Sequence, residues 1–156
     1  MKRKLSGRFW CALTLFSLIG QVAWVVENMY LNVFIYNMFR ASASDISLMV
    51  AMSAVAAALT TVFIGALADK IGKRKMFICG GYILWGISIF CFTLLKTEIL
   101  GTLFPMVAHA ASLGITLTVT LDCIMTFFGS MANDACYNAW ITDCGDESHR
   151  GKIEGV

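Results

Sequence analysis

Residues 65–74 read Gly65-Ala66-Leu67-Ala68-Asp69-Lys70-Ile71-Gly72-Lys73-Arg74, which is the pattern G-x-x-x-D-K-x-G-K-R. The stretch lies between two long apolar segments, so we expect it to end one helix and to form a short turn into the next. Gly65 would let another helix approach closely. Asp69 would pair with an arginine or cap a neighbouring helix, and Gly72 would permit the tight turn. An ordinary basic loop explains the lysines and the arginine, but not Gly65, Asp69 and Gly72 in register.

Four apolar segments in the chain are long enough to cross a membrane, which takes about 20 residues. The chain is 58% hydrophobic and 14% charged, whereas a soluble domain carries about 25% charged residues. Pro105 and Gly114 are expected to end a stretch that does not span, before the last of these segments. The composition therefore indicates an all-α integral membrane protein. Its expected helices cover residues 9–39, 46–68, 76–95 and 116–140.

Basic residues are distributed unequally between the two sides of these segments. Ten of the twelve lie on one side, and only Arg40 and Lys96 lie on the other. By the positive-inside rule, the amino terminus and the turn at residues 69–75 are cytoplasmic. All cytoplasmic segments agree with one topology of four crossings. The ten are Lys2, Arg3, Lys4, Arg8, Lys70, Lys73, Arg74, Lys75, Arg150 and Lys152.

The stretch 65–74 resembles the signature loop of the major facilitator superfamily, at every defining position and between the same two spans. The resemblance implies a fold of twelve helices in two halves of six. Residues 1–156 would then be a partial amino-terminal transmembrane domain with four of the twelve helices, and the missing remainder of its own chain would be its partner. The resemblance also implies that Asp69, with Lys70, Lys73 and Arg74, forms a cytoplasmic charge network that helps to switch between open faces.

The first expected helix carries polar residues inside its apolar run. Gln21, Asn28 and Asn32 share one helical face with Trp24. Glu27 stands about 100° from Asn28 around the helix. A carboxylate inside a membrane is costly and usually faces a cavity or a partner. The face therefore predicts part of a binding cavity, with interhelical hydrogen bonds or an interfacial Glu27 as the alternatives.

The fourth expected helix carries a polar sector of about 120° at 100° per residue. Two carboxylates in one sector suit a cavity for a polar solute or a cation. The alternative for Asp122 is a position at the outer end, in contact with water. The sector contains Asp122, Thr126, Ser130, Asn133, Asp134 and Tyr137.

Residues 133–140, with Thr142, Asp143 and Arg150-Gly151, resemble the glycoside–pentoside–hexuronide branch of cation-coupled sugar symporters. In that branch an Asp of the fourth helix lies at the shared sugar and cation site, and Asp134 is the matching position. The chain departs from the drug–proton antiporters, which carry an arginine deep in the fourth helix, since no Lys or Arg occurs between Lys96 and Arg150.

These features favour a secondary active transporter in the cell membrane, which couples import or export of a sugar or other small polar solute to a proton or sodium gradient. No enzymatic activity, other cofactor, metal ligand or nucleic-acid partner is expected. The alternative is a four-helix membrane enzyme or a subunit of a membrane complex. Its polar cluster would comprise Asp134, Asp143, Asp146, Glu147 and His149.

The charge distribution predicts which loops a membrane-impermeant thiol reagent reaches in intact cells. In a variant without the native cysteines, a single cysteine at position 43 or 97 should be labelled from outside. A single cysteine at position 73 or 146 should be labelled only after the cells are permeabilised. Labelling of position 73 in intact cells would reverse the orientation.

Overall fold

The computed structural model describes residues 6–103, 110–144, 151 and 155, and these residues form helices joined by short turns. Four helices are long and apolar enough to cross a membrane: Gly7–Phe39, Ala43–Ile71, Arg74–Leu94 and Ala111–Asp143. The individual elements are α1 (Gly7–Phe39), α2 (Ala43–Ile71), α3 (Arg74–Cys91), the 3-10 turn η1 (Phe92–Leu94), α4 (Thr97–Leu103), α5 (Ala110–Ser130), the π-helix η2 (Met131–Tyr137) and α6 (Asn138–Cys144).

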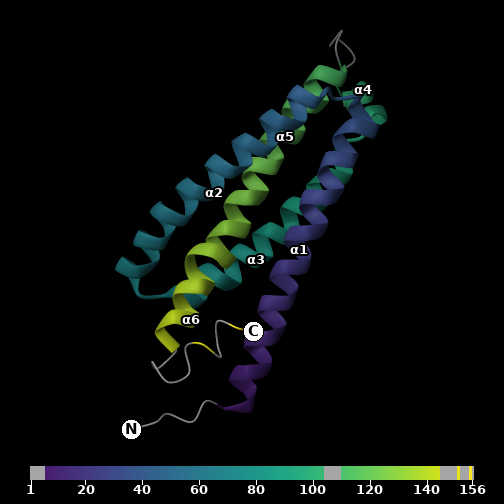
Figure 1. Cartoon of the computed structure of the whole chain (residues 1–156). Helices are drawn as coiled ribbons and strands as arrows, with labels where there is room; N and C mark the ends of the chain where they lie inside the picture. Colours follow the sequence, from purple (N-terminus) through teal and green to yellow (C-terminus); the bar gives the residue numbers. More distant parts are fainter. Residues whose placement is uncertain (1–5, 104–109, 145–150, 152–154, 156) are drawn as a thin grey trace.

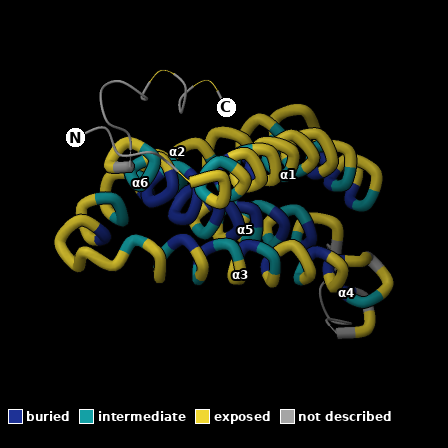
Figure 2. Tube along the Cα trace, turned by 90° about the horizontal axis from the view of Figure 1, so that it is seen from below, coloured by how far each residue is buried: buried dark blue, intermediate teal, exposed yellow. Residues whose placement is uncertain are grey.

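The long helices run alternately up and down (Figure 1). The junction of α1 with α2 and the short α4 lie at one end, while the α2–α3 turn and α6 lie at the other. The buried positions gather along α5 and η2, whereas α1, α2 and α3 expose most of their outer surfaces (Figure 2). Large apolar side chains such as Met29, Phe63 and Phe90 are exposed there, as expected for surfaces that face lipid.

The second helix extends beyond its expected boundaries, 46–68, at both ends for identifiable reasons. The second helix begins at Ala43 because Ser42 caps it: the Ser42 hydroxyl accepts from the Asp45 N–H, and the Asp45 carboxylate accepts from the Ser42 N–H at 2.9 Å. The same helix continues to Ile71 and ends at Gly72, whose φ of 70° is left-handed. Gly72 thus forms the tight turn that the sequence predicts.

The expectation for Gly114 was wrong, because this glycine lies inside α5 rather than at a break. Pro105 lies outside the described residues. A Cβ atom at Gly114 would overlap the aromatic ring of Phe39 at the end of α1. The glycine therefore allows the fourth span to pack closely on the first. A pattern of single residues does not distinguish a glycine that ends a helix from one that accommodates a neighbouring ring.

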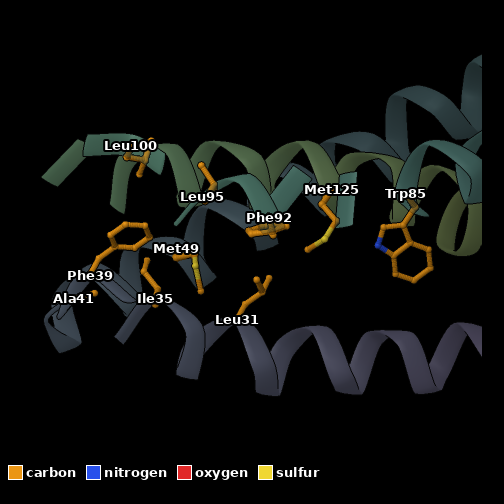
Figure 3. Close-up of a cluster of buried hydrophobic side chains, with 10 residues drawn as sticks. All are labelled: Leu31, Ile35, Phe39, Ala41, Met49, Trp85, Phe92, Leu95, Leu100 and Met125. Carbon is orange, nitrogen blue, oxygen red and sulfur yellow. The ribbon is translucent and has the colours of Figure 1, made fainter. Parts of the chain in front are cut away.

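Phe39 belongs to a cluster of buried apolar side chains near the α4 end of the bundle (Figure 3). Side chains from α1 to α5 contribute to this cluster, which fixes the separation of the helices on this side of the bundle. Its buried members are Leu31, Ile35, Phe39, Ala41, Met49, Trp85, Phe92, Leu95, Leu100 and Met125.

The contact between Gly114 and Phe39 predicts a cost for a single methyl group. Gly114→Ala should lower the free energy of unfolding by about 1–3 kcal/mol, because the buried ring must move. Gly86→Ala is the control, since a Cβ there meets nothing within 4 Å and should be neutral or stabilising by up to about 1 kcal/mol. Denaturant unfolding in detergent micelles measures both, and equal effects would contradict this packing.

Candidate functional site

Arg74 connects the α2–α3 turn to the end of the fourth span. Its Nε donates to Asp69 Oδ1 at 3.0 Å, and one of its terminal nitrogens donates to the Ala139 carbonyl oxygen at 3.1 Å. That nitrogen also forms an ion pair with Asp143. The planar guanidinium suits several acceptors at once, which an ammonium group cannot match. Both carboxylates are well exposed, so each pair is worth only about 0–1 kcal/mol.

The other residues of the signature stretch contribute less to this network. Lys70 and Lys73 are exposed, and no ion pair of either is found in the part of the chain that the structure describes. An added Cβ at Gly65 would meet nothing within 4 Å. The expected close approach of a second helix at Gly65 is therefore absent among the described residues. Asp143, which the sequence analysis did not assign to this network, is its third charged member.

A cavity of about 150 Å³ lies between α1, α2 and the fourth span. Leu31 and Met49 belong both to its wall and to the buried apolar cluster, so the cavity adjoins the core. Asp122 is 5% exposed and Thr126 is 3% exposed. These two side chains are thus held in a largely desolvated setting, whereas the other polar residues of the wall are half-buried, apart from the exposed Asn28. The polar part of the wall comprises Glu27, Asn28, Asn32, Ser53, Asp122 and Thr126.

Each carboxylate of this cavity receives a hydrogen bond from a neighbouring helix. The Trp85 indole Nε1–H of α3 donates to Glu27 Oε2 at 2.9 Å. The Ser53 hydroxyl of α2 donates to Asp122 Oδ2. Such bonds offset part of the cost of burying a carboxylate. In each carboxylate the other oxygen can still accept a hydrogen bond or bind a ligand.

A second polar group lies nearer the α2–α3 turn, where the fourth span becomes π-helical. The Tyr82 hydroxyl donates to Asn133 Oδ1 at 3.2 Å. The Tyr137 hydroxyl lies 2.8 Å from the Leu13 carbonyl oxygen and 3.0 Å from Ser17 Oγ. These contacts join the π-helix to α1 and α3. Asp134 is half-buried, and its Oδ1 accepts from Asn133 Nδ2 at 3.4 Å.

The structure therefore separates residues that the sequence assigned to one face. Asp122 lines the cavity with Glu27, whereas Asp134 lies in the π-helix with Asn133 and is not part of the cavity wall. The physical reason is distance along the helix: Asp134 follows Asp122 by twelve residues, which at 1.5 Å per residue is about 18 Å along the axis, so the two carboxylates lie at different heights of the span. Gln21 is exposed and lies outside the cavity as well.

The sequence did not predict the three hydrogen-bond partners of Asp122, Glu27 and Asn133. Ser53 lies in a run of small residues that resembles a packing surface, and Trp85 lies in an apolar run, so neither carries a local signal. The one general signal is that a carboxylate inside a membrane needs a hydrogen-bond donor on a neighbouring helix. Tyr82 also lies in an apolar run, and it is half-buried and bonded to Asn133.

Four apolar helices that pack with carboxylates at their contacts, among them the buried Asp122, define a multi-pass membrane protein. A model of the Major Facilitator Superfamily matches residues 9–153. No curated protein and no solved structure matches the chain. The chain thus belongs to the Major Facilitator Superfamily, and it is a member of a family of secondary transporters.

The family assignment favours the transporter prediction over the enzyme alternative. Within the described residues, no group of three or more His, Cys, Asp and Glu side chains could hold a metal ion. Asp134 and Asp143 lie in separate environments, the first in the π-helix and the second beside Arg74. Asp146, Glu147 and His149 lie outside the described residues.

The Arg74 network predicts a local effect on α6. Arg74→Ala should speed hydrogen exchange of the α6 amides by roughly fivefold, the equivalent of about 1 kcal/mol. Arg74→Lys should recover only part of the protection, because one ammonium cannot reproduce the guanidinium fork. Lys75→Ala, an exposed neighbour, is the control. Unchanged exchange in Arg74→Ala would show that the network does not hold α6.

Proposed function

We propose that the protein is a cation-coupled symporter of a sugar or another small polar solute. It would work by alternating access in the cell membrane, with its amino terminus in the cytoplasm. The observation that carries the proposal is the pair of carboxylates, Glu27 and Asp122, on the wall of one cavity inside the helix bundle. Buried carboxylates of this kind are costly to maintain and mark ion and proton pathways in membrane proteins.

The second polar group supports the solute part of the proposal. Tyr82, Asn133 and Tyr137 supply hydroxyl and amide groups that can both donate and accept, which matches the hydroxyl groups of a sugar. Asp134 lies beside them. Asn133, Asp134 and Tyr137 also belong to the stretch 133–140 that resembles the sugar symporters. Binding of a solute here and of a cation in the neighbouring cavity would place both on the fourth span.

The Arg74 network supports the alternating-access part. It connects the α2–α3 turn with α6 through two exposed ion pairs. Because each pair is worth only about 0–1 kcal/mol, the network can close one end of the bundle and still open at modest cost. Asp69 and Asp143 would then exchange partners as the bundle changes its open face.

The proposal is tested with the complete twelve-helix transporter that contains residues 1–156, purified and reconstituted in sealed vesicles, with a panel of radiolabelled mono- and disaccharides and an imposed proton or sodium gradient. We expect saturable uptake above that of protein-free vesicles. Asp122→Asn should abolish gradient-driven accumulation, because it removes a cavity charge, while solute exchange at equal concentrations persists. Glu98→Gln, the same chemical change at an exposed carboxylate of α4, should leave both intact.

Two outcomes would contradict the proposal. One is the absence of saturable uptake for the whole panel under both gradients. The other is normal accumulation by Asp122→Asn, which would show that the cavity carboxylate does not couple the gradient to the solute.

A further inference from the structure

The two asparagines of the cavity are oriented by the helix backbone. Asn28 Nδ2 donates to the Trp24 carbonyl oxygen at 2.8 Å, and Asn32 Nδ2 donates to the Asn28 carbonyl oxygen at 2.8 Å. A backbone carbonyl can only accept a hydrogen bond, so the nitrogen of each amide must face it. Each side chain therefore keeps its Oδ1 for other partners. Asn32 Oδ1 is shielded from solvent and has no hydrogen-bond partner among the described residues.

Ser53 and Glu27, two further polar residues of the cavity wall, also keep an oxygen that can accept. Ser53 uses its hydroxyl hydrogen on Asp122, so its oxygen lone pairs stay free. Trp85 occupies Oε2 of Glu27, which leaves Oε1. The amide nitrogens of both asparagines, the Ser53 hydroxyl and the Trp85 indole N–H thus each donate to the protein itself. Oxygen atoms of these groups and of Glu27 remain able to accept. A wall of free acceptors repels another acceptor and attracts a cation.

The size of the cavity limits which ligand it can hold. At about 30 Å³ for each water molecule, 150 Å³ holds roughly five waters or one ion with part of its hydration shell. Pockets for larger organic ligands measure about 300–1,000 Å³. The cavity is therefore too small for a sugar. Carboxylate, amide and hydroxyl oxygens are the ligands that hard metal cations prefer.

We propose that this cavity is a binding site for one Na⁺ ion. Its ligands would be drawn from Glu27, Asp122, Asn32 Oδ1 and Ser53 Oγ, with Asn28 and Thr126 adjacent. The ion would offset the negative charge of the two carboxylates and supply the missing partner of Asn32 Oδ1. The choice of Na⁺ among hard cations rests on the proposed symport function, because a coupling ion needs a gradient across the membrane.

The site is tested by equilibrium binding, without transport. The purified protein in detergent is unfolded thermally at increasing NaCl, with choline chloride keeping the ionic strength constant, and tryptophan fluorescence follows unfolding. We expect a saturable rise of the unfolding temperature with Na⁺. Asn32→Ala should raise the half-maximal Na⁺ concentration about tenfold or more, and Asn32→Asp, which keeps an oxygen there, should retain binding. Asn37→Ala, an exposed asparagine on the same helix, should behave like the native protein.

Three results would overturn the Na⁺ site: no stabilisation by Na⁺ beyond choline, an equal loss in Asn32→Ala and Asn37→Ala, or saturable stabilisation by Ca²⁺ or Mg²⁺ alone. Failure of the symport proposal can be distinguished from failure of the Na⁺ site. Saturable Na⁺ binding without uptake of any solute would leave the site standing and contradict symport. Uptake driven by protons in Na⁺-free buffer, with no Na⁺ stabilisation, would support symport and overturn the site.

Discussion

The hydrogen bond from Ser53 to Asp122 joins the second span to the fourth, at a carboxylate that is 5% exposed. Lipid offers no hydrogen bonds and no charge, so a carboxylate at this depth must be solvated by the protein itself. The fourth span consequently cannot rotate its polar side outward. It lies between the other spans and turns its polar side chains toward them, as the gathering of buried positions along α5 shows (Figure 2).

The same constraint connects the fold with the function. Helices α1, α2 and α3 surround α5 with their own polar groups, and their outer surfaces are apolar. Glu27 on α1 is satisfied by Trp85 of α3, and Asn133 of the π-helix by Tyr82 of α3. The polar groups that hold the helices together are therefore also the groups that a solute or an ion would meet. In a transporter, binding of a solute or an ion would then change the contacts between helices directly.

Much of the fold could be predicted from the sequence, because lipid imposes a simple rule on length and charge. The apolar runs identify the spans, and Gly72 identifies the turn between α2 and α3. The partners of the site could not be predicted, since Ser53 and Trp85 are distant in sequence from the carboxylates that they contact. Asp134 and Asp122 share a sector of the helix but lie about 18 Å apart along its axis, so only Asp122 reaches the cavity.

The most direct test of this account is a double-mutant cycle on the free energy of unfolding in detergent micelles, with Ser53→Ala, Asp122→Asn and the double variant. If the contact fixes the fourth span against the second, the two changes are not additive and the coupling energy is about 1 kcal/mol. Additive effects, with a coupling energy indistinguishable from zero, would show that Asp122 is satisfied in another way and would contradict the account.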